Sequence, residues 1–167
     1  MGIRSELHLE KVGNNKPHMP HACYHMNASE NDGFLQVLKD VRLPNGYSSN
    51  ISCCVKLKER KISEMKSHDN HILMQQLFPI AIRGLLPLEV SRPLIDLSCF
   101  FREICSKVLN MDELGVLEKK IAMTLCELER IFLPSFFTMM VHQVMHLASK
   151  AKVAGSVHYH WMYPIER

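Results

Sequence analysis

The sequence predicts a mainly α-helical protein, a helical bundle with an irregular N-terminal arm. Two observations predict this class. After about residue 62, apolar residues recur with a period near 3.6 between Pro, Gly and Asn punctuation, and no strand-like alternation of comparable length accompanies them. The chain has 167 residues, of which 47% are hydrophobic and 22% charged, so it is long and apolar enough to bury a core.

The N-terminal part, residues 1–61, is expected to be an irregular arm with short helices. Residues 1–28 contain scattered Gly, Asn, Pro and His without a helical period. A polar cap at residues 29–32 predicts a short helix ending near Val41, and a second short helix is expected over residues 51–58.

Residues 62–167 are expected to form the helical domain. Its four helices are predicted over residues 72–80 with a kink at Pro79, from Pro93 to Val108, from Met111 to Leu128, and from Pro134 towards Gly155. Each carries an apolar stripe wide enough to face a common core.

Composition limits the function classes. The net charge of +3 is mild, so it permits contact with nucleic acid without requiring it. The six cysteines form no CxxC pair and no secretory leader is recognisable, so reduced thiols in the nucleus or cytoplasm are expected rather than secretion. No apolar run reaches the roughly 18 residues of a membrane span, and no small-molecule substrate is indicated.

Two histidine pairs are the candidate metal ligands. His68 and His71 lie three apart and His142 and His146 four apart, so each pair shares one face of its helix. A single pair is more often ordinary core or surface histidine. Two pairs on separate helices favour a zinc site that ties the first helix of the domain to the last, and we expect at least three of the four imidazoles to converge.

Long segments of the chain resemble a known family. KSHDNHILMQQLFPIAIRGLLP, LSCFFREICSKVL, LERIFLPSFFTMMVHQVMHL and VHYHWMYPIER are together similar to a plant domain of unknown function that recurs in transposase-related proteins of the CACTA (En/Spm) class. MGIRSELH and GYSSNIS resemble the segment that precedes this domain in the family. The resemblance therefore extends over both residues 1–61 and residues 62–167.

The resemblance implies a place in a larger enzyme. Cut-and-paste transposases cleave DNA with three acidic residues that hold two divalent metals. Several insert a helical region that ends with a His pair before the last acid. Here Glu166 follows His146 by 20 residues, which implies that Glu166 is the third acid and that the histidines clamp the insertion. By the same analogy, Asp69 caps its helix or orients a histidine.

The departures from this pattern set the main hypothesis. No Asp pair on strands of an RNase H-like sheet precedes the histidines, and Glu166 alone cannot hold two Mg²⁺ ions, so Mg²⁺ is expected only in a complete parent transposase. We expect a transposon-derived fragment without independent catalysis, which binds DNA or other transposase subunits.

Two other interpretations remain open. A metal-dependent phosphohydrolase could use the His68-Asp69 dipeptide, although a suitable downstream Asp ligand is hard to find. A protein-interaction module could use residues 161–164, WMYP, if these large side chains are exposed rather than packed against the bundle.

Overall fold

Helices dominate the described part of the chain, which confirms the mainly α class. The computed structural model describes residues 10–12, 16–18, 21–43 and 51–156. Its longer helices are α1 (Ala28–Asp40), α5 (Leu88–Ile104), α6 (Met111–Ile131) and α7 (Met139–Ala154). Shorter ones are α2 (Ile51–Cys54), α3 (Ser67–Ile72) and α4 (Phe78–Ala81). Within these residues no helix is both long and apolar enough to cross a bilayer.

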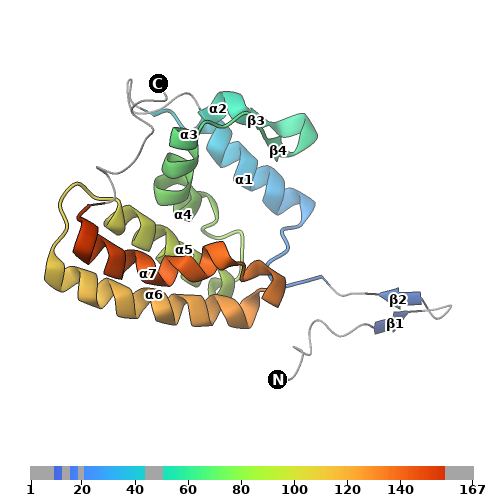
Figure 1. Ribbon diagram of the computed structural model, residues 1–167. Coiled ribbons are helices and arrows are strands. Elements are labelled where there is room, and N and C mark those ends of the chain that lie inside the picture. The colour runs from blue at the N-terminus through green and yellow to red at the C-terminus, as the bar shows by residue number, and fades with distance from the viewer. Residues whose placement is uncertain (1–9, 13–15, 19–20, 44–50, 157–167) are drawn as a thin grey trace.

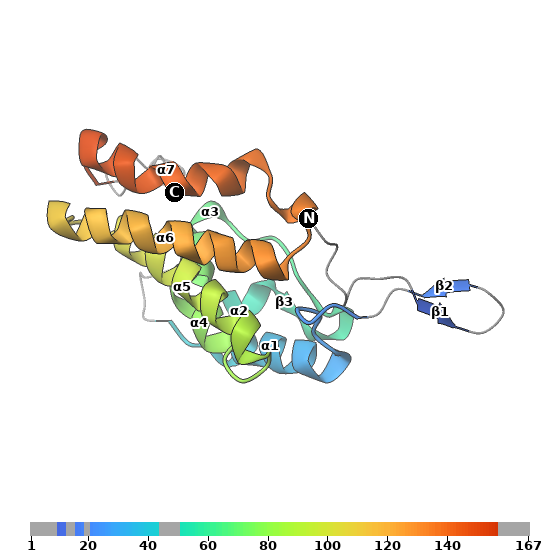
Figure 2. The ribbon, with the colours of Figure 1, turned by 90° about the horizontal axis from the view of Figure 1, so that it is seen from below.

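The three C-terminal helices pack around one hydrophobic cluster. The three helices lie side by side (Figure 1), and Figure 2 shows α6 between α5 and α7, both of which it contacts. The buried side chains of this cluster are Phe100, Ile104, Leu114, Leu117, Ile121, Leu125, Leu128, Ala148 and Ala151. Burying an aliphatic side chain of this size contributes about 1.5–3 kcal/mol, so this cluster is a main source of stability.

A second hydrophobic cluster holds the N-terminal elements together. Its buried residues are Leu35, Leu38, Ile51, Val55, Ile72, Leu77 and Ala81, contributed by α1 to α4 and by strand β3 (Val55–Lys56). Strand β3 pairs antiparallel with β4 (Lys61–Ile62). The expected boundary between residues 61 and 62 divides β4, so residues on both sides of it pack into the same unit.

The expected irregular arm contains two short strands and a capped helix. Strands β1 (Glu10–Val12) and β2 (Lys16–His18) pair antiparallel, and this ribbon stands apart from the helices in both views (Figure 1, Figure 2). The predicted helix ending near Val41 is confirmed as α1. Its cap is Asn27, whose Oδ1 accepts from the backbone N–H of Glu30 at 2.9 Å, while Glu30 Oε2 accepts from Asn27 N–H at 2.7 Å.

Two prolines lie within continuous helical stretches, Pro79 in the first turn of α4, directly after a π-helical segment, and Pro93 inside α5. The expected kink at Pro79 takes the form of a π-helical segment, η3 (Leu73–Leu77), between α3 and α4. Proline has no N–H for the carbonyl four residues earlier, and the wider π turn accommodates that loss. The helix expected to start at Pro93 begins at Leu88 and ends at Ile104, because the loss of one hydrogen bond near its start is outweighed by burial of Val90 and Pro93.

The last two helices follow the sequence more closely. Helix α6 begins at Met111, as expected, after Asn110, whose side chain accepts from the backbone N–H of Asp112 at 3.0 Å. Helix α7 starts later than expected. Residues Pro134–Phe136 form a 3-10 turn, η4, and α7 begins at Met139 and ends before Gly155, which has a φ of +83°.

Candidate nucleic-acid interface

The four candidate metal ligands lie on different parts of the fold. His68 and His71 are half-buried on α3, whereas His142 and His146 are exposed on α7, with their ring centroids 5.2 Å apart. In the described part of the chain, which includes all four, no three His, Cys, Asp or Glu side chains come close enough together to hold a metal ion. The expected convergence of at least three imidazoles is therefore wrong.

Packing explains this separation. The side of α7 that carries Ala148 and Ala151 is buried in the cluster with α5 and α6. His142 and His146 therefore remain on the exposed part of the same helix. Helix α3 contributes Ile72 to the other cluster, together with α1 and α2.

Asp69 has a structural role, as expected. Its side chain is 1% exposed and Oδ2 accepts from the backbone N–H of Lys66 at 3.1 Å, at the first turn of α3. Burial, followed by the charge of His68, lowers the pKa of His71 below its usual value. A phosphohydrolase site built on His68-Asp69 would need further ligands beside this dipeptide, and the described residues do not supply them.

Two expectations concern residues outside the described ranges. Glu166, the expected third acid, and the WMYP segment at residues 161–164 both lie there. The role of Glu166 as a catalytic residue stays a prediction.

The positive charge of the protein is concentrated in one segment. Residues 39–66 contain seven of the 20 Lys and Arg residues and three of the 17 Asp and Glu residues, a net charge of +4. The rest of the chain, with 13 basic and 14 acidic residues, has a net charge of −1. The whole excess of positive charge therefore belongs to this segment, which runs from the end of α1 to the start of α3.

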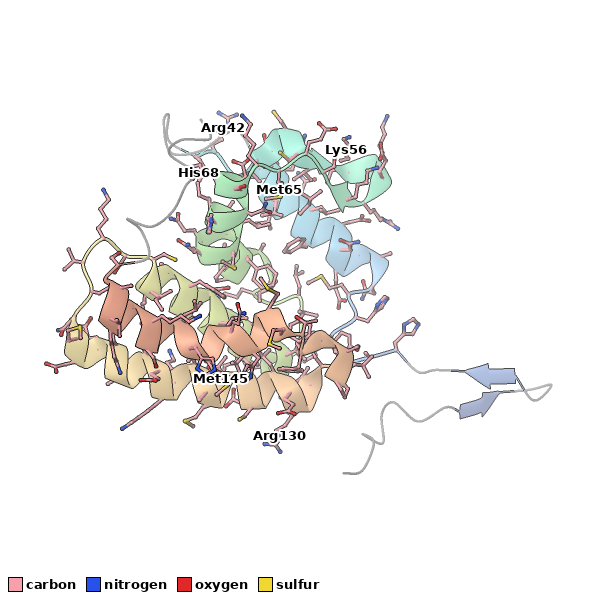
Figure 3. All side chains as sticks on the ribbon, viewed as in Figure 1. Arg42, Lys56, Met65, His68, Arg130 and Met145 are labelled. Atoms are coloured by element: carbon pink, nitrogen blue, oxygen red, sulfur yellow. The ribbon has the colours of Figure 1, made fainter. Side chains whose placement is uncertain are left out.

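We call the seven basic residues of this segment the basic face: Lys39, Arg42, Lys56, Lys58, Arg60, Lys61 and Lys66. Contacts of Lys39 with Ser52 and of Arg60 with Asp32 bring α1 next to α2 and the turn between β3 and β4. Figure 3 shows Arg42 and Lys56 at the upper side of the molecule, over α2 and β3, while Arg130 of α6 lies at the opposite side. The turn between β3 and β4 is a 3-10 helix, η2 (Leu57–Glu59), which carries exposed Lys58.

Four of these basic side chains have contacts that fix their positions. The ammonium group of Lys39 donates to the carbonyl oxygen of Ser52 at 2.8 Å. The other three form ion pairs, Arg60 with Asp32 at 2.8 Å, Lys56 with Glu64 at 3.4 Å, and Lys61 with Glu59. These contacts tie the β3–β4 hairpin to α1 and to the chain that follows it.

Three cations of the basic face remain available to a ligand. Arg42, Lys58 and Lys66 are exposed, and none forms an ion pair with another residue of the described ranges. Arg42 follows α1, Lys58 lies in the hairpin turn, and Lys66 directly precedes α3. Exposed Lys and Arg side chains held on a common surface are the groups that contact nucleic-acid phosphates.

The sequence analysis did not predict the basic face, because the net charge of the whole chain is only +3. The basic residues are split between residues 39–42 and residues 56–66 by 13 residues without any charge. The run KLKERK at residues 56–61 was the available signal, and a count of charge by segment would have found it.

A family model matches the C-terminal part of the chain. No curated protein and no solved structure matches the chain. The basic face lies outside the region that does match a family model. That region, residues 104–167, begins at the last residue of α5, includes α6 and α7, and is similar to a domain of unknown function, DUF4218.

Proposed function

We propose that this protein is a transposase-related helical domain without catalysis of its own, which binds the phosphate backbone of DNA through the basic face. The observation that carries the proposal is the concentration of the entire positive excess in residues 39–66, with Arg42, Lys58 and Lys66 exposed and free of ion pairs within the described ranges. Cations that neutralise phosphates supply most of the affinity of non-specific DNA binding.

The link to transposases rests on the sequence resemblance to CACTA (En/Spm) proteins. The match of residues 104–167 to DUF4218 is compatible with this link and assigns no activity by itself. A DNA-binding domain of such an element would act in the nucleus, and other transposase subunits would be its protein partners.

Binding to a short DNA duplex of random sequence, measured by fluorescence anisotropy at several salt concentrations, tests the proposed surface. The triple variant Arg42→Gln, Lys58→Gln, Lys66→Gln is expected to bind at least about tenfold more weakly. The slope of log Kobs against log[salt] should become shallower by about 2.7, which corresponds to three lost phosphate contacts.

A matched control separates the surface from the total charge. The triple variant Lys107→Gln, Lys119→Gln, Arg130→Gln also lowers the net charge from +3 to 0, but it changes exposed residues outside the basic face. It should retain the salt slope of the unmodified protein. Equal losses in the two variants would show that the basic face has no special role.

The absence of catalysis needs a separate assay. The full chain is incubated with DNA and Mg²⁺ or Mn²⁺, and neither nicking nor strand transfer is expected. Metal-dependent cleavage that Glu166→Gln abolishes would overturn this half of the proposal and leave the DNA-binding half to the anisotropy result.

A further inference from the structure

A separate pocket lies between the C-terminal half of α5 and the N-terminal half of α6. Its volume is about 620 Å³, within the range of about 300–1,000 Å³ typical of small-molecule sites. The apolar side chains that line it are Val108, Leu109, Leu114, Val116 and Leu117. None of its lining residues belongs to the basic face.

The apolar lining has a buried part and an exposed part. Leu114 and Leu117 are 1% and 6% exposed and also belong to the hydrophobic cluster of α5, α6 and α7. Val108 and Val116, in contrast, are 85% and 68% exposed. Two exposed valines beside a buried apolar surface leave room for an apolar ligand, which would remove their side chains from water.

The charged groups around the pocket differ in their partners. Lys120 pairs with Asp96 at 3.1 Å, and the side-chain amide of Asn110 donates to Glu113 at 3.4 Å. Glu103 lies close enough to Lys120 for its charge to raise the pKa of that ammonium, after the larger effect of Asp96. Each of these groups therefore already interacts with a neighbour inside the protein.

Arg102 is the exception among the charged residues that line the pocket. Within the described ranges, the contact that its guanidinium makes is with the sulfur of Cys99, to which Nη2 donates at 3.7 Å. Thiol sulfur is a weak acceptor, whereas a guanidinium can donate two parallel hydrogen bonds to one carboxylate. The charge of Arg102 is thus complementary to an anionic head group.

We propose that this pocket binds a small amphipathic carboxylate, with its carboxylate on the Arg102 guanidinium and its hydrocarbon chain against Val108 and Val116. The hydrocarbon chain would cover the two exposed valines, and the carboxylate would accept hydrogen bonds from the Arg102 guanidinium. This site is independent of DNA binding, because it uses neither Arg42, Lys58 nor Lys66.

Octanoate is a suitable probe, with octan-1-ol and octylamine as controls for the head group. Isotope-labelled full-length protein is titrated with each compound, and its amide resonances are followed by NMR. Octanoate is expected to shift resonances of residues 102–120 in a saturable way and to bind about tenfold or more tightly than octan-1-ol, the difference that a charge-assisted bidentate contact can supply.

Two variants and one matched control test the assignment. Arg102→Gln should weaken octanoate binding about tenfold and leave octan-1-ol binding unchanged, since it removes the charge alone. Val116→Glu should weaken both compounds. Arg92→Gln, at another exposed arginine of α5, should change neither.

Three results would overturn the proposal. The first is the absence of saturable shifts with octanoate in residues 102–120. The second is equal affinity for octanoate and octan-1-ol, which would exclude recognition of the anion. The third is tighter binding of octylamine, which would assign the head-group contact to Glu103 or Glu113 instead of Arg102.

Discussion

The guanidinium of Arg60 donates two parallel hydrogen bonds to the carboxylate of Asp32, from Nε to Oδ1 and from Nη2 to Oδ2, both 2.8 Å long. Arg60 has a left-handed backbone conformation, with a φ of 49°, at the end of the turn between β3 and β4. Asp32 lies on α1. The pair therefore joins the hairpin of the basic face to the first helix, and it keeps Arg60 occupied.

Asp32→Asn is expected to lower stability and raise DNA affinity together. The substitution breaks the ion pair, so the midpoint of urea unfolding should move to a lower concentration. It also frees Arg60 for a phosphate, so the salt slope of DNA binding should steepen by about 1. Asp112→Asn, on α6, adds the same charge and should leave the salt slope unchanged. A shallower slope in Asp32→Asn would contradict the assigned position of Arg60 on the DNA-binding surface.

Asp69→Ala is expected to destabilise the protein by about 2 kcal/mol, the upper end of the range for loss of a helix cap, because the acceptor is buried. Asp69→Asn should cost less, since the amide oxygen can still accept from the N–H of Lys66. Urea unfolding of both variants measures this order. If the two variants lost equal stability, the negative charge of Asp69 would matter more than its hydrogen bond to the backbone.

Mild acid should destabilise the folded state through His71. Burial and the charge of His68 lower its pKa in the folded protein, so the unfolded chain binds a proton more readily below about pH 6.5. The free energy of unfolding is then unaffected by His71 above about pH 6.5 and decreases as the pH falls, by at most about 1.4 kcal/mol per pH unit. Urea unfolding at several pH values measures the slope.

A comparison of two variants assigns that slope. His71→Asn should flatten the pH dependence, whereas His142→Asn, at an exposed position, should retain it. An unchanged slope in His71→Asn would assign the acid sensitivity to other groups.

Addition of a zinc chelator is expected to leave the fold unchanged. Because α3 and α7 belong to different clusters and no three ligands gather in the described ranges, a chelator should not shift the melting temperature. Elemental analysis of the purified protein should find less than one zinc per chain. A melting temperature lowered by chelator, with stoichiometric zinc, would show that the histidine pairs are brought together in solution.

The sequence predicted helices well where local signals agree with packing. Helix α6 combines the Asn110 cap with a regular apolar stripe, and its start was expected correctly. The start of α5 was placed at Pro93 because proline is common in the first turn of a helix. Burial of Val90, which no local rule reveals, extends the helix back to Leu88.

The candidate site was harder to predict because it depends on tertiary contacts. Spacing places His142 and His146 on one side of a helix, and their rings do lie close together. Spacing does not determine which helix that side faces. The basic face was missed for a different reason. Its residues come from two segments that are separated along the sequence, and only the packing of α1 against α2 and the β3–β4 hairpin brings them together.

Helix α5 contacts elements of both hydrophobic clusters. Phe100 and Ile104 lie in the cluster with α6 and α7, and the same helix packs against the π-helical segment and α4. Separation of α6 and α7 from α5, or of α4 and the π-helical segment from α5, would expose an apolar side of α5 and so destabilise the contacts on its other side. The described helices should therefore melt in one cooperative step, and residue 104, where the family match begins, marks a border of sequence similarity but not a border of folding.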